Sequence, residues 1–381
     1  MSKNGISGFN SERLQQIMTI RGLTQAQLAA MVGVSTSTLS KWKNGQHMPD
    51  IDALNRLANI LDVTAEWFTR PIISGIEIPL FRSNASAYKH ARLMLKERLS
   101  WLEESVMYLS EYVDFPKQIL PKREFVNPKE ISQIDIEIAA LEFREIMGLG
   151  QAPIQNLLLA VEGAGVIVVR EITDISTIEG LSTWGKETKI PLILLSADKD
   201  NYFRSRFDLA HELGHLILHK HIPDKLRDTF YNTMEEQAHA FAGALLLPED
   251  SFVSKIRIPT TLDDLLIQKQ YWGISVAAII MRLHKLGLID DDAKTNLFKR
   301  RSARWGAKSE PGDKDRQPEK PVLLKRTIEL LINEKILDIE NMKSYFGLGQ
   351  KDLINLLGLN VDFFERKNSK IIPFTKLKKY S

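Results

Sequence analysis

The stretch FDLAHELGHLILHKH at residues 207–221 holds four of the eight histidines in this chain of 381 residues. We expect the stretch to be helical, and His211 and His215, four residues apart, then project from one face. Two neutral imidazoles at this spacing can bind one Zn²⁺. Glu212 directly follows the first histidine, so its carboxylate would lie beside the ion, where it can accept a proton from water. The segment therefore predicts a helix that carries a metal site.

A zinc site with catalytic chemistry needs a third protein ligand and an open fourth position. Residues 235–248, EEQAHAFAGALLLP, predict a second helix. Glu235 falls on the side of its apolar positions, and the twenty residues that separate it from His215 allow an antiparallel return. Glu235 is the favoured third ligand. Glu236 is its main alternative, and His239 is a weaker candidate that would otherwise support a ligand from behind.

Three further residues of the histidine segment have simpler interpretations. His219 continues the face of the pair by one more turn, which is too far along the helix to reach the same ion. We interpret His219 and His221 as ordinary polar residues. Gly214 has no side chain, so it lets a neighbouring strand or a substrate come close. By composition, a chance HExxH in such a chain has a frequency on the order of one in a hundred.

Composition limits the kinds of site and the compartment. The chain has no cysteine, which excludes disulfides, thiolate zinc sites, cysteine catalysis and cysteine-ligated iron–sulfur clusters. This fits a reducing cytoplasm, where we expect the protein. No apolar run is long enough to span a bilayer, and the N-terminus lacks the apolar core of a signal peptide. A length of 381 residues with 44% hydrophobic and 26% charged residues predicts two or three globular domains.

Residues 1–70 predict a bundle of four helices. The first ends near Gly22, and Thr24 and Ser35 are placed to cap the second and third. Gly33 supplies the positive φ that a tight turn needs. The apolar stripes that define the four helices contain Leu14, Ile17, Met18, Leu28, Ala29, Val32, Leu39, Trp42, Leu54, Leu57, Ala58 and Leu61.

The third predicted helix has the outer face that a helix needs in the major groove of DNA. Its hydroxyls can bind base edges, and its lysines can bind phosphates. Gln25, near the positive N-terminus of the second helix, suits a backbone phosphate. The candidate DNA-binding residues are Gln25, Ser35, Thr36, Ser37, Ser40, Lys41 and Lys43.

The pattern TQxxLA…GVS…LSxWxNG…P resembles the XRE/Cro-repressor helix-turn-helix family over about residues 9–70. The resemblance implies DNA binding, usually as a homodimer on a palindrome. A small helical bundle with a polar surface is the alternative. Seven Lys and Arg face five Asp and Glu over residues 1–70, so a single copy should bind DNA with modest affinity.

Residues 71–130 predict a linker or short strand and then a long helix that ends before Pro116. The apolar residues of this helix alternate at spacings of three and four, for less than three heptads. This apolar seam either packs within the chain or forms a coiled-coil dimer, and packing within the chain is the favoured alternative. The apolar seam consists of Leu95, Leu99, Leu102, Val106, Leu109 and Val113.

Residues 131–302 predict an α+β domain. Two helices come first, the second with Pro153 in its first turn. GVIVVREI, GLSTWG and IPLILLSADK predict three strands, and the last is apolar enough to lie in the centre of the sheet. The histidine helix follows. Residues 180–183, GLST, could form an edge strand that pairs with an extended substrate.

The segments RxRFxLAHELGHLxLH and ExxAxxFAxxLLxP resemble the ImmA/IrrE family of zinc metallopeptidases, over about residues 132–311. The resemblance implies a zincin-like fold with His211, His215 and Glu235 as Zn²⁺ ligands and Glu212 as general base. Mn²⁺ and Fe²⁺ accept the same ligand types. This chain departs from the family pattern at Gln237 and His239, which favours Glu235 over Glu236 as ligand and leaves the groups behind the ligands undefined.

An oxyanion in the transition state also needs a donor. Tyr231, one turn before Glu235, and Arg206 are the candidates. Residues 303–321 are charged and broken by prolines and glycines, which predicts a flexible connector. Residues 322–381 predict a small helical region with a basic tail whose role is docking or closure of the fold. The tail contains Arg366, Lys367, Lys370, Lys376, Lys378 and Lys379.

Three functions compete. The favoured hypothesis is a DNA-binding transcriptional regulator whose zinc-dependent endopeptidase domain cleaves a repressor or antitoxin-like partner, under stress or in the switch of a mobile element. The alternative is a regulator whose zinc domain only senses or binds. The third is an enzyme whose helix-turn-helix docks protein rather than DNA. Cleavage of a repressor by the wild type, compared with Glu212→Gln, discriminates between them.

Overall fold

The computed structural model describes residues 6–365, except for residues 74, 78, 80–88, 174, 176, 177 and 307. The described part is mostly helical and contains one three-stranded sheet. None of its helices combines the length and apolar character needed to cross a bilayer. The predicted basic tail, which begins at Arg366, lies outside the described residues.

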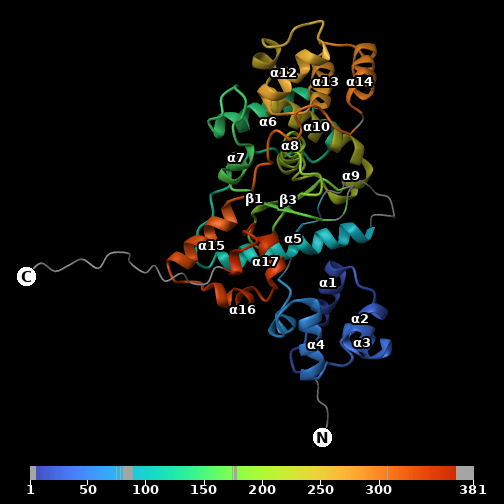
Figure 1. Ribbon diagram of the computed structural model, residues 1–381, viewed down its shortest axis with the longest axis vertical. Coiled ribbons are helices and arrows are strands. Elements are labelled where there is room, and N and C mark those ends of the chain that lie inside the picture. The colour runs from blue at the N-terminus through green and yellow to red at the C-terminus, as the bar shows by residue number, and fades with distance from the viewer. Residues whose placement is uncertain are drawn as a thin grey trace, which may run out of the picture.

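The N-terminal residues form the predicted bundle of helices (Figure 1). Thr24 caps the second helix by accepting from the backbone N–H of Gln27, and Ser35 caps the third by accepting from that of Thr38. Gly33 has a φ of 75°, the left-handed conformation expected for the turn between them. The elements are α1 (Ser11–Arg21), α2 (Gln25–Val32), α3 (Thr36–Lys43), α4 (Ile51–Leu61) and η1 (Glu66–Thr69).

The long helix α5 (Lys89–Leu109) lies between this bundle and the rest of the protein (Figure 1). Its apolar seam from Leu95 to Leu109 is buried in a core shared with the bundle. Arg13 of α1 adds a buried ion pair to Glu104 of α5, with 2.5 Å between Nη2 and Oε1. The seam is therefore covered by the chain itself, as the favoured alternative predicts.

The α/β core begins with η3 (Pro128–Glu130), α6 (Gln133–Ile146) and α7 (Leu157–Gly163). The sheet has the order β1-β3-β2, with β3 parallel to β1 and antiparallel to β2. The central place predicted for IPLILLSADK is confirmed. Pro153 does not lie in the first turn of α7, because Asn156 caps that helix by accepting from the N–H of Leu159. The strands are β1 (Ile167–Glu171), β2 (Gly180–Trp184) and β3 (Pro191–Ser196).

The sheet separates two apolar cores. Leu192 and Leu194 of β3 face the core that includes the N-terminal bundle and α5. Ile193 and Leu195 face the other core, which includes the helices of the histidine segment. This alternation is the period of two expected of a strand that is buried on both faces.

The histidine segment forms α8 (Tyr202–Leu218), and the chain returns through α9 (Asp224–Thr229) to α10 (Tyr231–Leu246). α8 packs on β2 and β3, and α10 packs on α8 and α6. Gly214 permits this close crossing, because a Cβ there would lie 3.0 Å from a ring carbon of Phe241. The neighbour of Gly214 is thus a helix, whereas the sequence predicts a strand or a substrate.

Four helices follow at the far end from the bundle (Figure 1): α11 (Glu249–Val253), α12 (Leu262–Trp272), α13 (Val276–Lys285) and α14 (Asp291–Trp305). The prediction of a flexible connector at residues 303–321 is wrong, because two acidic residues of this segment are paired with side chains elsewhere in the fold. Buried Glu310 pairs with Lys269 and Arg301 and accepts from the backbone of Val276. Glu319 pairs with Arg206. Glu310 and Glu319 therefore fasten this segment to the fold.

The last described residues form a small helical region, as predicted. It packs on β1 and also contacts the bundle, where Val63 and Leu348 form an antiparallel bridge. Asp352 accepts from both Arg21 of α1 and Arg98 of α5. The elements are α15 (Leu323–Asn333), η4 (Ile339–Asn341), α16 (Met342–Phe346), α17 (Gln350–Leu356) and η5 (Phe363–Glu365).

Candidate metal centre and nucleic-acid interface

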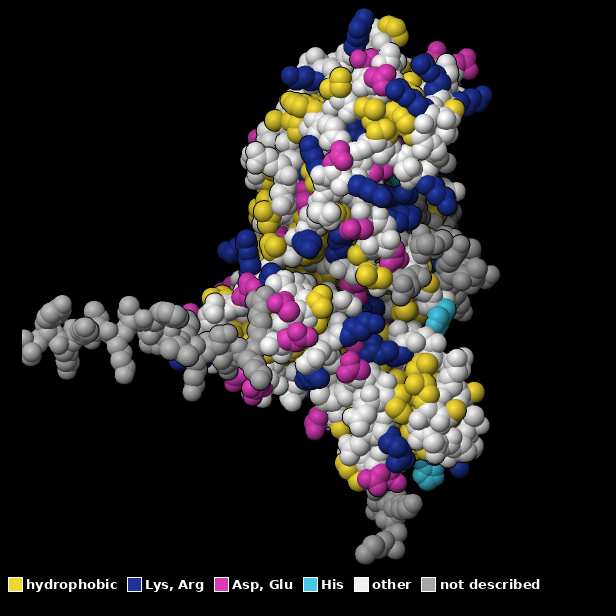
Figure 2. Space-filling view, viewed as in Figure 1, with side chains coloured by type: hydrophobic (Ala, Val, Ile, Leu, Met, Phe, Trp, Pro, Cys, Tyr) yellow, Lys and Arg dark blue, Asp and Glu magenta, His cyan; other side chains and the backbone are white. Residues whose placement is uncertain are grey.

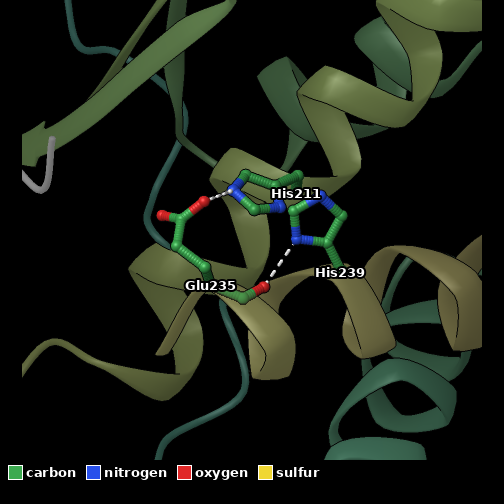
Figure 3. Close-up of side chains that lie close together, drawn as sticks. All are labelled: His211, Glu235 and His239. Atoms are coloured by element: carbon green, nitrogen blue, oxygen red, sulfur yellow. Dashed lines mark hydrogen bonds and ion pairs between the residues drawn. The ribbon is translucent and has the colours of Figure 1, made fainter. Parts of the chain in front are cut away.

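The crossing of α8 and α10 brings His211, His215 and Glu235 together. The Nε2 atoms of the two histidines lie 3.1 Å apart. The carboxylate of Glu235 lies 3.1 Å from Nε2 of His215 through Oε1 and 3.4 Å from Nε2 of His211 through Oε2. Figure 3 shows the carboxylate of Glu235 pointing at the ring of His211.

These separations fit a zinc ion. Ligand atoms about 2.0–2.1 Å from Zn²⁺ in a tetrahedron lie about 3.3–3.4 Å from one another. Oε2 of Glu235 is buried and makes no hydrogen bond to the described residues, so it has a coordination site to offer. Burial alone would raise the pKa of Glu235, but the two facing histidines outweigh it and lower the pKa. Glu236, the alternative ligand, is exposed on the rim of the adjoining cavity.

His239 lies next to this group, one turn after Glu235 on α10. Its Nδ1 is 2.7 Å from the backbone oxygen of Glu235, and its ring centroid is 4.4 Å from that of His211 (Figure 3). Ligand atoms of His211, Glu235 and His239 all lie within 4.8 Å of one another. His215 is nevertheless a better metal ligand than His239 beside His211 and Glu235. Its Nε2 lies 3.1 Å from a ligand atom of each of these residues, and His215 is buried.

Glu212 is held against the sheet on the other side of the histidine pair. A Cβ on Gly180 would lie 2.8 Å from Cγ of Glu212 and 2.9 Å from its Oε1. Glu212 is only 6% exposed, and its Oε2 has no hydrogen-bond partner among the described residues. Burial raises the pKa of the Glu212 carboxyl, against the opposing effect of His215 and His211. A carboxylate with a raised pKa is suited to accept and release a proton.

A cavity of about 1080 Å³ opens beside these residues and extends to α13 and α14. Asp208 and Glu179 also line it. Burial, and then Glu179, raise the pKa of Asp208. Burial would raise the pKa of Glu179 too, but Lys199 and Arg204 lower it to about 2. The cavity therefore has room for an extended peptide. Of the two acidic residues described in its wall, Asp208 has a raised pKa and Glu179 a lowered one.

Two residues behind the ligands were not identified from the sequence. Nδ1 of His219 lies 2.9 Å from Nδ1 of His215, and Nε2 of His219 lies 3.1 Å from Oε1 of Gln237. His219 is fully buried, which lowers its pKa. The available signal was the spacing, since His219 follows His215 by the same four residues that separate His215 from His211.

The two candidate transition-state donors have different outcomes. Arg206 is 2% exposed, and its guanidinium binds Glu319, the hydroxyl of Tyr202 and the carbonyl of Ile154. These partners bind its two terminal nitrogens, and Arg206 does not line the cavity beside the histidines, so the structure does not place it as a donor at the metal centre. Tyr231 lies at the start of α10, half-buried and one turn before Glu235, so its role stays a prediction.

β2 is an edge strand of the sheet, as predicted for residues 180–183. Its far end is already paired within the chain, because Glu77 donates its backbone N–H to the carbonyl of Trp184. The end at Gly180 lies against Glu212. Pairing of a substrate with this strand stays a prediction for the part next to Glu212.

In the N-terminal bundle, α3 turns Thr36, Ser37 and Lys41 to solvent, while Leu39 and Trp42 are buried. Ser40 and Lys43 are half-buried, and the hydroxyl of Ser35 is used as the cap of α3. The amide of Gln25 donates to the carbonyl of Thr36, 2.9 Å away, so it joins α2 to α3. The face of the bundle seen in Figure 2 carries few charged side chains and an apolar patch.

Comparisons with known proteins match both the N-terminal bundle and the domain that contains the histidine helix. Residues 14–68 match the helix-turn-helix family model, and residues 161–284 match the IrrE N-terminal-like domain of the M78 peptidases. The chain thus carries an XRE-type helix-turn-helix domain fused to an IrrE-like M78 domain, as the two sequence resemblances predict.

Two similar curated proteins are named as regulators of transcription. The chain is 37% identical over 70 residues to the HTH-type transcriptional activator BcrR of Enterococcus faecalis, which covers 18% of this chain and 32% of BcrR. It is 30% identical over 59 residues to YonR, an uncharacterized prophage-derived HTH-type transcriptional regulator of Bacillus subtilis, which covers 16% of this chain and 55% of YonR. The matches thus span about a third and about half of these relatives.

Proposed function

We propose that this protein is a DNA-binding regulator with a zinc-dependent endopeptidase domain that cleaves a repressor or antitoxin-like protein partner. The observation that carries the proposal is the meeting of His211, His215 and Glu235 at 3.1–3.4 Å, with Glu212 buried beside them. Mn²⁺ and Fe²⁺ are alternative occupants, because nitrogen and oxygen ligands accept them.

The chemistry divides between the ion and the chain. The two histidines and Glu235 would hold a Zn²⁺, which would lower the pKa of a bound water and polarise a peptide carbonyl. Glu212 accepts the proton and passes it to the leaving nitrogen, for which its raised pKa is suitable. The cavity beside the ligands receives the substrate, and β2 near Gly180 positions it. Tyr231 is the proposed donor to the oxyanion.

The N-terminal bundle is proposed to bind double-stranded DNA, with α3 in the major groove. Exposed Thr36, Ser37 and Lys41 contact base edges and phosphates. Ser40 and Lys43 lie beside them on α3. Gln25 and Ser35 lie close to the sugar–phosphate backbone of the DNA. The two curated relatives are both named as regulators of transcription, and one of them as prophage-derived. Two copies on a palindromic operator, in the switch of a mobile element, are consistent with those names.

The test uses the full chain with its metal content measured. Purified wild type and Glu212→Gln are incubated with the repressors encoded by neighbouring genes, and the products are identified by mass spectrometry. We expect one defined cut by the wild type and none by Glu212→Gln, although both bind equal amounts of zinc. Equal cutting by both proteins would remove Glu212 from the chemistry. If neither cuts while both bind DNA, the domain is a sensing or interaction module.

A further inference from the structure

Gln237 is the fixed end of a chain of hydrogen bonds that leads to the metal ligand His215. Its Nε2 lies 2.7 Å from the backbone oxygen of Pro128 and 3.2 Å from that of Ile131. Both partners are carbonyl oxygens, which only accept, so the amide nitrogen must be the atom that faces them. The amide oxygen of Gln237 therefore faces His219, and its orientation is determined.

This orientation determines which ring nitrogens carry protons. The oxygen of Gln237 only accepts, so Nε2 of His219 must carry the hydrogen between them. His219 has 0% exposure, and its hydrogen-bond partners among the described residues are His215 and Gln237, neither of which is a carboxylate, so burial favours its neutral form. In its neutral form His219 then has a bare Nδ1, which accepts from Nδ1 of His215. The remaining nitrogen of His215, its Nε2, faces Oε1 of Glu235 at 3.1 Å, so it is the nitrogen at which a bound metal ion would replace a proton.

We propose that Gln237 and His219 hold His215 in the tautomer whose Nε2 is free to bind the metal ion. The proposal rests on the metal site of the proposed function, and it makes both residues positioning residues rather than ligands. It also accounts for their burial, since a polar chain of this kind is stable only when each member has its partner. Groups that bind the far side of a ligating histidine fix its tautomer and ring orientation.

The other histidine ligand lacks such support. Nδ1 of His211 is buried with no hydrogen-bond partner among the described residues. No hydrogen bond to Nδ1 of His211 among the described residues therefore determines which of its nitrogens carries the proton. Of the two histidine ligands, His215 is the one whose tautomer the surrounding polar groups determine. We therefore expect the affinity of the site to depend on His219 more than its distance from the ion suggests.

The first experiment compares two replacements of His219 and measures zinc affinity by competition with a chromophoric chelator. His219→Leu removes the acceptor for His215, and affinity should fall about 10- to 100-fold. His219→Gln keeps an acceptor oxygen for His215 and a donor for Gln237, so it should bind within a few-fold of the wild type. His221→Leu is the matched control, since His221 is exposed and lies outside the chain of bonds.

Equal affinity of His219→Leu and the wild type would overturn the proposal. An equal loss in both His219 variants would also overturn it, because packing and not hydrogen bonding would then be the cause. The second experiment needs no metal and no substituted protein. The ¹⁵N shifts of the imidazole rings in metal-free wild type should show a protonated Nδ1 in His215, and a bare Nδ1 with a protonated Nε2 in His219. A bare Nδ1 in His215 refutes the relay, whereas a wild type that binds no zinc refutes the proposed metal site instead.

Discussion

Replacement of Asp352 by alanine should destabilise the joint between the DNA-binding bundle and the rest of the protein. Asp352 on α17 is 4% exposed and accepts from Arg21 of α1 at 3.1 and 2.5 Å and from Arg98 of α5 at 2.5 Å. Arg98 also pairs with Glu171 at the end of β1. One carboxylate thus connects three elements that are distant in sequence.

The size of the effect follows from what remains after the carboxylate is removed. Loss of one partner of a buried ion pair costs about 3–5 kcal/mol, because the other charge stays buried without compensation. Arg98 keeps Glu171, and the side chain of Arg21 is 25% exposed and keeps the carbonyl of Leu61. We therefore expect about 3 kcal/mol, the lower end of that range.

Urea unfolding followed by circular dichroism measures this cost. Glu329→Ala is the control in the same region, since its pair with Lys325 is only half-buried and 4.0 Å long and should contribute less than about 1 kcal/mol. In a double-mutant cycle, Arg21→Ala and Asp352→Ala should couple by about 1–3 kcal/mol. A cost for Asp352→Ala no larger than that of Glu329→Ala would refute the reasoning.

The same carboxyl gives a pH dependence. Burial would raise the pKa of Asp352, but Arg21 and Arg98 outweigh it and lower the pKa below the ordinary value for aspartate. The stabilisation is therefore present in full above the unfolded pKa of about 4 and decreases as pH falls toward the lower folded value. Asp352→Ala should accordingly be less sensitive to acid than the wild type below about pH 4.

The remaining predictions concern the two candidate sites. Glu235→Ala should abolish stoichiometric zinc binding in dialysed protein measured by elemental analysis, whereas Glu236→Ala should retain it. Gly180→Ala places a methyl group 2.8 Å from Cγ of Glu212; it should keep zinc but lower kcat for cleavage about 10- to 100-fold, since small displacements of catalytic groups have effects of this size. Lys41→Ala should weaken operator binding and reduce the slope of log affinity against log salt by about 1; an unchanged slope would remove this lysine from the phosphates.

Local patterns predicted the helices and the central strand well. Caps such as Thr24, Ser35 and Gly33 act over three or four residues, so the sequence alone identifies them. The start of α7 shows the limit of this reasoning. A proline suits the first turn of a helix, but Asn156 offers a side-chain cap three residues further on, and the helix begins there.

The candidate site was predicted as far as helix geometry reaches. The spacing of His211 and His215 and the side occupied by Glu235 follow from helical periodicity, and the structure brings all three together. Gln237 could not be assigned in the same way, because its partners are backbone carbonyls near residue 130, more than a hundred positions away. Arg206 shows the converse error, since a charged residue near a motif looked available while Glu319, 113 residues later, binds it.

Charged residues explain why the domain organisation was harder to predict than the secondary structure. A segment such as 303–321 reads as solvated because Lys, Asp and Glu are rarely buried, yet burial is decided by partners elsewhere in the chain. The sheet connects the two apolar cores. Leu192 and Leu194 of β3 pack in the core of the bundle, and Ile193 packs in the core of α8. Protein interiors are close-packed and transmit strain, so we expect a displacement of β3 that begins at the bundle to change its packing against the helix that holds His211 and His215.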